Sequence, residues 1–201
     1  MTEQQPKKTA VSGAKRGTKA ASKPSVEQIQ EFAAPVYDVY YPTETWSEVL
    51  PGLTLGGTDS FDDMANLRSE PVGFGMPEAT ITKEKFDTVV TLYAWAKPAD
   101  WFVKELRLGI LDGDLSDFDW VEMRNLVLSA HSDWKSGKRV LIRCQAGINR
   151  SSLVMALVLV REGFSARKAI ELMRQKRGQA VLANRHFVEW LTGLDVRKWR
   201  D

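Results

Sequence analysis

The chain has only one cysteine and two histidines among its 201 residues. A single cysteine cannot form an intramolecular disulfide, which favours a reducing compartment. The two histidines, His131 and His186, are far apart in the sequence and indicate no metal site. A disulfide-stabilised fold and a zinc-binding fold are therefore both disfavoured.

Long apolar runs are also missing. The longest one, residues 153–160, has eight residues and ends at Arg161, whereas a membrane span needs about 20. Residues 1–25 lack the apolar stretch of a secretory signal. We expect a cytoplasmic protein without a membrane partner, and the 43% hydrophobic content is enough for a core.

The net charge of +2 conceals a basic amino-terminal tail. Residues 1–25 hold six Lys or Arg and one Glu, and they contain little that could be buried. Such a segment is expected to be disordered; it is either a solvated tail or a weak contact for nucleic acid. We predict a disordered tail at 1–25, a lead-in segment at 26–44 and one domain at 45–201.

Strand-like and helix-like patterns alternate along the predicted domain. Strands are predicted at 53–56, 88–92, 106–111 and 139–143. Helices are predicted at 117–136, at 151–162, from a cap at Ser165 to Arg177, and after a cap at Asn184. Residues 70–83, with two Pro and two Gly, resemble a surface insertion.

This alternation predicts an α/β fold in which helices flank a central, mostly parallel sheet. The most apolar strand, 139–143, should lie at the centre. Ligands bind at the carboxyl ends of such strands. Cys144, Asp112 and the loop at 93–101 each follow a predicted strand, so we expect them to open into one crevice.

The stretch "CQAGINR" at 144–150 joins the central strand to a helix. Gly147 permits a tight turn, and the turn's backbone N–H groups can form a nest for an anion at the helix N-terminus. Arg150 can clamp phosphate oxygens, and the same positive field favours a thiolate at Cys144. We interpret Cys144 as a nucleophile under a bound phosphate; the alternative is a buried structural cysteine. The absence of a Gly-Lys-Ser/Thr sequence excludes a Walker loop.

Attack on a phosphate ester also needs an acid for the leaving oxygen. Asp112 follows a predicted strand and is the preferred candidate, with Asp114 as its alternative or its assistant. Asp117 and Asp119 fit better as residues at the start of a helix.

"CQAGINRSS" resembles the Cys-x5-Arg-Ser/Thr signature of cysteine-dependent tyrosine phosphatases, and the chain is similar to small dual-specificity protein phosphatases. The resemblance extends to "LPGLTLGG", "FDTVVTL", "LDGDLSDF", "SARKAIELMRQKR" and "NRHFVEWL", and it covers about residues 45–194. It implies a tyrosine-phosphatase-like fold, no metal or other cofactor, and phosphorylated proteins as substrates. These would carry phosphotyrosine, and also phosphoserine or phosphothreonine.

The resemblance also assigns roles to residues. Cys144 would form a cysteinyl-phosphate, Asp112 would act as acid and then as base, and Ser151 would ease departure of the sulfur. The phosphate would be held by Gln145, Ala146, Gly147, Ile148, Asn149 and Arg150. Arg143 departs from the family, which has His before the Cys; its guanidinium could favour the thiolate or point to solvent.

Other functions remain open. The Gly-x-Asn-Arg sequence and the basic tail would suit an RNA 5′-phosphatase or triphosphatase of the same superfamily. A catalytically weak phosphate-binding module and a rhodanese-like sulfur carrier are further alternatives. A loop without lysine disfavours phosphoinositides. Trp95 and Trp101 could stack on a substrate ring or serve in packing.

Overall fold

The computed structural model describes residues 42, 44–58 and 80–200. The chain divides into Met1–Tyr37, which lies outside these residues, and one compact unit, Asp38–Asp201. The predicted tail and most of the predicted lead-in segment also lie outside the described residues, as does most of the predicted insertion. These three assignments stay predictions.

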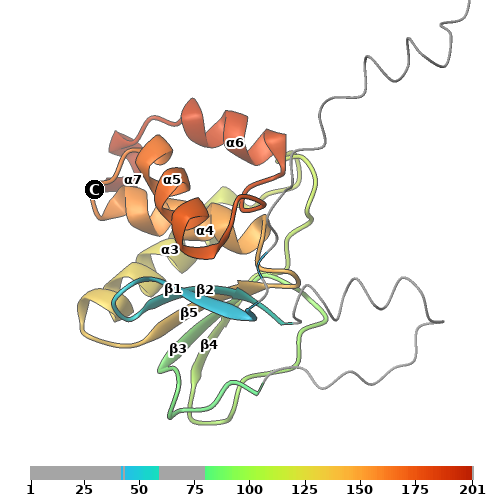
Figure 1. The fold of residues 1–201 in the computed structure, drawn as a ribbon, viewed down its shortest axis with the longest axis vertical. Coiled ribbons are helices and arrows are strands. Elements are labelled where there is room, and N and C mark those ends of the chain that lie inside the picture. Colours follow the sequence, from blue (N-terminus) through green and yellow to red (C-terminus); the bar gives the residue numbers. More distant parts are fainter. Residues whose placement is uncertain (1–41, 43, 59–79, 201) are drawn as a thin grey trace, which may run out of the picture. The chain divides into compact units, whose positions relative to one another are not determined.

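A five-stranded sheet forms one layer of the domain (Figure 1). Its strands are β1 Trp46–Leu50, β2 Leu53–Gly57, β3 Thr88–Thr91, β4 Lys104–Arg107 and β5 Val140–Cys144. Their order is β1-β2-β5-β3-β4, and only β1 runs antiparallel to its neighbour. The mostly parallel α/β sheet is therefore confirmed, and β5 lies at its centre as predicted.

Two strands differ from the sequence prediction. β1, which was not predicted, pairs with β2 across a turn in which Gly52 has φ +75°, a conformation that favours glycine. β4 was predicted at 106–111 but lies at 104–107, because Lys104 is in register with Thr88 of β3. The more apolar residues that follow it leave the strand and lead toward Asp112.

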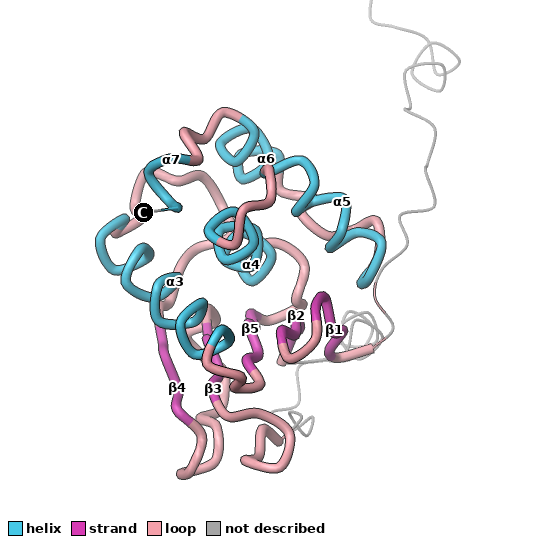
Figure 2. Tube along the Cα trace, turned by 90° about the vertical axis from the view of Figure 1, so that its left-hand side faces the viewer, coloured by secondary structure: helices cyan, strands magenta, loops and turns pink. Residues whose placement is uncertain are grey.

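The described helices lie on one face of the sheet (Figures 1 and 2). They are α3 Trp120–Lys135, α4 Arg150–Arg161, α5 Ala166–Arg177, α6 Arg185–Thr192 and α7 Arg197–Arg200. The caps of α5 and α6 are confirmed: Ser165 accepts a hydrogen bond from the backbone N–H of Lys168, and Asn184 accepts from His186 and Phe187. None of these helices has the length and apolarity needed to cross a bilayer.

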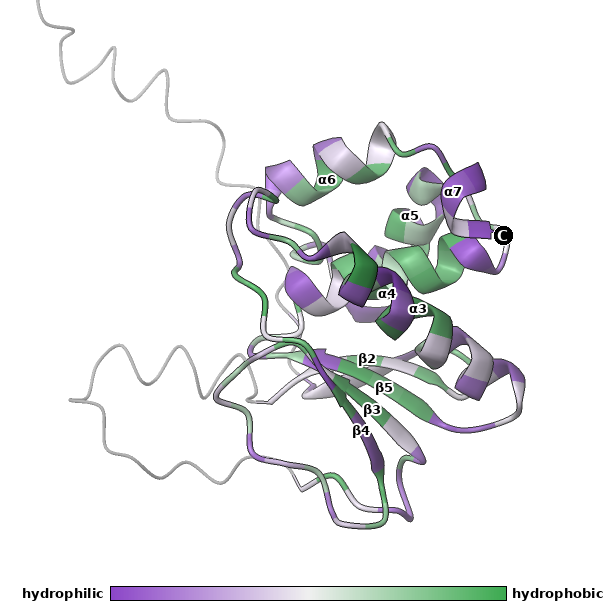
Figure 3. Cartoon of the chain, turned by 180° about the vertical axis from the view of Figure 1, so that it is seen from behind, coloured by the Kyte–Doolittle hydropathy of each residue, from purple (hydrophilic) through white to green (hydrophobic). Residues whose placement is uncertain are grey.

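Alternating side chains of the central strands enter two different cores. Val140, Ile142 and Cys144 of β5 belong to the large core on the helical face, where α4 buries residues 151–160. Leu141 packs on the other face, in a small cluster that includes Phe86. Figure 3 shows hydrophobic residues along β3 and β5, the strands that separate the two cores. Since successive side chains point to opposite faces, Cys144 and Arg143 are directed to different sides of the sheet.

Candidate active site

Cys144 is the last residue of β5, opposite Gly57 of β2. The backbone N–H of Thr58 donates to its carbonyl oxygen at 2.9 Å, which anchors the strand end. Its side chain is buried, and Sγ lies 3.2 Å from the hydroxyl of Ser151 in the first turn of α4. A hydroxyl at this distance can donate a hydrogen bond to a thiolate.

The loop after Cys144 can turn only at a glycine. Gly147 has φ +68°, and a Cβ there would lie 2.4 Å from the carbonyl carbon of Gly56 and 2.5 Å from Nη2 of Arg177. Both the backbone conformation and the close approach exclude a side chain. The loop is therefore pressed against the end of β2.

Arg177, at the end of α5, lies against this loop. Its Nε donates to the Gly147 carbonyl oxygen at 2.8 Å and its Nη2 to that of Ala146 at 3.3 Å. In a planar trans peptide, the N–H points away from the C=O of the same unit. Because Arg177 holds these two carbonyls, the N–H groups of Gly147 and Ile148 point away from it.

The loop's backbone donors are left without protein partners. In the described part of the chain, the backbone N–H groups of residues 145–149 donate to no protein acceptor. Unpaired backbone donors next to a buried strand end require an explanation. Consecutive amides at a helix N-terminus form a site that favours a negative group.

Arg177 also brings a buried positive charge close to Cys144. It is 6% exposed, and within the described ranges no carboxylate pairs with it. Burial lowers its pKa to about 10, and the negative charge of a Cys144 thiolate opposes this shift. Arg177 thus stays protonated near neutral pH, and a thiolate at Cys144 would supply compensating negative charge.

Arg177 was not among the predicted site residues. A basic residue in the last turn of a helix reads as a partner for the helix dipole. However, Arg177 falls on the buried stripe of α5 with Ala169, Ile170 and Met173. A charged residue in line with an apolar stripe is the sequence signal that could have identified it.

Arg150 opens α4 and faces the loops after β3 and β4. Its guanidinium lies over the ring of Tyr93, 5.3 Å from the centroid, and its Nη1 donates to the Ile110 carbonyl oxygen at 3.4 Å. Its Nε is buried and has no hydrogen-bond partner within residues 42, 44–58 and 80–200. That N–H is available to an oxygen atom of a bound oxyanion.

Asp112 is held at the loop by two amide side chains. Its Oδ2 accepts from Nδ2 of Asn149 at 3.1 Å and its Oδ1 from Nδ2 of Asn184 at 3.0 Å. The backbone N–H of Asn184 in turn donates to Oδ1 of Asn149 at 2.9 Å. This triangle joins the loop after β4, the loop after β5 and the start of α6, and it places the Asp112 carboxylate beside the predicted phosphate loop.

The neighbouring aspartates have other contacts. Asp114 accepts from the side chain and the backbone N–H of Ser116, and these bonds lower its pKa. Asp119 caps α3 by accepting from the N–H groups of Val121 and Glu122. The expectation that Asp119 starts a helix is confirmed, whereas Asp117 does not cap it.

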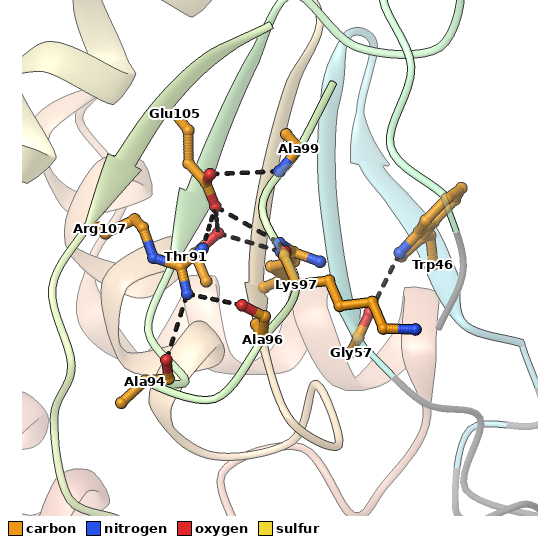
Figure 4. Close-up of polar contacts among 10 residues, drawn as sticks. Trp46, Gly57, Thr91, Ala94, Ala96, Lys97, Ala99, Glu105 and Arg107 are labelled. Carbon is orange, nitrogen blue, oxygen red and sulfur yellow. Dashed lines mark hydrogen bonds and ion pairs between the residues drawn. The ribbon is translucent and has the colours of Figure 1, made fainter. Parts of the chain in front are cut away.

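Arg143 corrects an expectation. It does not point to solvent, since it is 1% exposed, and it lies on the face opposite Cys144. Its Nε donates to the hydroxyl of Thr91 at 3.0 Å, and its Nη2 lies 3.4 Å from Oε1 of Glu105. Figure 4 shows Thr91 and Glu105 within a network of polar contacts there.

The two tryptophans of the 93–101 loop are separated by topology. β3 and β4 are parallel, so their connection runs from the carboxyl end of β3 to the amino end of β4. Trp95 is close to the carboxyl end of β3. Trp101 shortly precedes the amino end of β4, which lies at the opposite end of the parallel strands. Both are exposed. The expectation that Trp101 faces the crevice is therefore wrong.

A metal site was not expected. Among the described residues, no group of three or more His, Cys, Asp or Glu could hold a metal ion.

Part of this chain is similar to a known protein family. Residues 121–196, which include the loop from Cys144 to Ser151, match the family model "Dual specificity phosphatase, catalytic domain". Over this part, the chain is similar to dual-specificity phosphatases. It is a phosphatase of the protein-tyrosine and dual-specificity class, and its substrates are phosphorylated.

Relatives and solved structures place this phosphatase among similar proteins. It is 25% identical over 107 residues to a protein of Invertebrate iridescent virus 6 that is named as a tyrosine phosphatase, 123R, covering 53% of this chain and 72% of the viral one. The structure of human DUSP28 matches with 18% identity and a TM-score of 0.57, over 80% of this chain and 97% of that one. DUSP15 matches with 19% identity and a TM-score of 0.57, over 77% and 92%. At these identities the two structures support the fold alone.

Proposed function

We propose that this phosphatase hydrolyses phosphate monoesters on proteins through a cysteinyl-phosphate intermediate. The substrates would carry phosphotyrosine, and also phosphoserine or phosphothreonine. Cys144 is the nucleophile, Arg150 and the amides of residues 145–149 bind the phosphoryl oxygens, and Asp112 is the general acid.

The first step transfers the phosphoryl group to sulfur. The Cys144 thiolate attacks phosphorus, the S–P bond forms, and the bond from phosphorus to the ester oxygen breaks. Asp112 gives its proton to that oxygen, which leaves as an alcohol or a phenol. Amide donors and Arg150 stabilise the charge on the three remaining oxygens.

The second step releases phosphate. The Asp112 carboxylate accepts a proton from water as the water oxygen attacks phosphorus, and the S–P bond breaks. The hydroxyl of Ser151, 3.2 Å from Sγ, donates to the departing thiolate. The enzyme returns to its starting protonation state, and no further reactant is required.

One observation carries this proposal: among the described residues, five consecutive backbone N–H groups and the Nε of Arg150 lack protein acceptors around a buried thiol. A merely structural cysteine needs no such arrangement of donors. A tetrahedral oxyanion would satisfy several of them together and would lie within reach of the sulfur.

Protein substrates are favoured over RNA by the contacts of Asn149. The Gly-x-Asn-Arg sequence resembles that of RNA 5′-phosphatases, but both ends of this amide are engaged, with Asp112 and with the backbone of Asn184. The asparagine therefore has an intramolecular explanation and needs no nucleotide contact.

The test is a substrate panel under metal-free conditions. The wild type should hydrolyse an aryl phosphate and phosphopeptides with a chelator present, and faster than triphosphate-ended RNA or inositol phosphates. Cys144→Ser should be inactive yet still bind inorganic phosphate. An active Cys144→Ser variant would reject the mechanism, and a preference for RNA would reject the substrate class.

A further inference from the structure

Arg143 and Glu105 lie at the centre of a polar cluster on the sheet face opposite Cys144. Glu105 accepts from the hydroxyl of Thr91 at 2.7 Å, from the backbone N–H of Ala99 at 3.2 Å and from Nη1 of Arg107 at 2.7 Å (Figure 4). Its side chain is 14% exposed and that of Arg143 is 2% exposed. The cluster joins the carboxyl ends of β5, β3 and β4.

The two arginines of this cluster bind the backbone of the β3–β4 connection. Arg143 donates to the carbonyl oxygen of Lys97. Arg107 donates to those of Ala94 at 3.3 Å and Ala96 at 2.7 Å, as Figure 4 shows for all three residues. The backbone N–H of Ala99 also donates to Glu105. Together these hydrogen bonds hold the connection at four positions between residues 94 and 99. Because a guanidinium and a carboxylate have fixed geometry, they determine the path of the backbone as well as its attachment.

The held segment begins at Tyr93, whose ring lies under the guanidinium of Arg150 at 5.3 Å. Arg150 also donates a 3.4 Å hydrogen bond to the carbonyl oxygen of Ile110, and its Nε has no hydrogen-bond partner in the part of the chain that the structure describes. The face of the tyrosine ring attracts the cation and thereby restricts its position.

We propose that Arg143 and Glu105 are positioning residues for the phosphate clamp, acting through the backbone of residues 94–97 and the ring of Tyr93 on Arg150. Arg143 stands where the family carries a histidine. On the sheet face opposite Cys144 it donates to the Lys97 carbonyl oxygen in the β3–β4 connection. The arginine that replaces the family's histidine thus helps to orient Arg150, which binds phosphate. The inference rests on the proposed function, because it requires Arg150 to bind phosphoryl oxygens.

The test is a double-mutant cycle with inorganic phosphate as the probe. Arg143→Met and Tyr93→Leu should each raise the Kd for phosphate about tenfold. Since both act through the same guanidinium, the double variant should be no more than about twofold weaker than either single variant. The rise in KM for an aryl phosphate should follow the same pattern.

Arg139 provides the matched control. It flanks the other end of β5 and pairs with Asp87 at 3.0 Å, and it also donates to the carbonyls of Lys83 and Glu84. Arg139→Met should lower Tm but change the Kd for phosphate by less than twofold, whether it is added to the wild type or to the Tyr93→Leu variant. Should Arg143→Met fail to fold, Arg107→Met should show the same coupling to Tyr93.

Additive effects of Arg143→Met and Tyr93→Leu, or an unchanged Kd in Arg143→Met, would overturn the inference and leave the proposed function standing. A wild type that binds phosphate but hydrolyses no monoester would reject the proposed function and leave the inference standing. A wild type that binds no phosphate would reject both.

Discussion

At the scale of single residues, two arginines define the site in different ways. Arg150 presents a donor to the space where a phosphate would bind, whereas Arg177 binds the carbonyl oxygens on the opposite side of the loop. The buried guanidinium of Arg177 therefore fixes the direction of the amides and supplies a positive charge near Cys144. Removing it should affect the thiol and the loop together.

Arg177→Met is expected to slow the alkylation of Cys144 by iodoacetamide several-fold near neutral pH, because it removes a buried positive charge that favours the reactive thiolate. The rate of alkylation across pH 4–9 measures this directly. Arg174→Met is the control, because Arg174 donates to the carbonyls of Val181 and Leu182 instead. Equal reactivity profiles for all three proteins would contradict an electrostatic role.

Asp112→Ala should lower kcat by about a hundredfold on substrates with poor leaving groups, the usual contribution of general acid catalysis. Asp114→Ala should change kcat less than threefold. The hydrogen bonds from Ser116 lower the pKa of Asp114, which makes this carboxyl group a poorer proton donor. The same bonds engage the carboxylate within its own loop. Steady-state kinetics on a series of aryl phosphates decides between them; the reverse ranking would move the acid to Asp114.

At the scale of elements, Asp133 connects α3 to the sheet. Its carboxylate accepts from the hydroxyl of Thr88 at 2.9 Å, from Lys104 at 2.7 Å and from Lys138 at 2.6 Å. Burial opposes its ionisation, but these hydrogen bonds outweigh that effect and lower its pKa to about 2. This helix forms one side of the core on which α4 and the loop rest.

The pH dependence of stability follows from this shift. Because the folded-state pKa of Asp133 is below its ordinary value of 3.8, its contribution is complete above about pH 4 and is lost as the pH falls toward 2. Asp133→Asn should lower the free energy of unfolding by about 2 kcal/mol at pH 7 and by much less near pH 2. Urea unfolding at both pH values measures the difference. Glu189→Gln, in an exposed pair with Arg185, should have little effect at either pH.

At the scale of the whole molecule, the lone thiol determines the response to oxidants. Cys144 is the only cysteine, so a sulfenic acid formed there has no second thiol with which to make an intramolecular disulfide. Peroxide should inactivate the enzyme, and prolonged exposure should convert Cys144 to the sulfinic and sulfonic acids, which thiol reductants do not reverse. Mass spectrometry of the peptide that contains Cys144 tests this; a sulfur that is inert to peroxide would argue against a reactive thiolate.

The sequence alone determined those features that depend on local pattern. The apolar run before Cys144 identified the central strand, and Ser165 and Asn184 were recognised as caps because capping needs only a short polar side chain and the next few N–H groups. The family resemblance and the loop from Cys144 to Ser151 could be read for the same reason, since this stretch forms one continuous strand–turn–helix unit.

Only the tertiary structure decided which distant residues meet at that loop. Arg177 follows Cys144 by 33 positions and Tyr93 precedes it by 51, and neither belongs to a local motif. The end of β4 and the side of the sheet on which Arg143 lies depended on strand register and on the order of the strands. Such features are set by long-range pairing of backbone and charge, which leaves little trace in any short window of sequence.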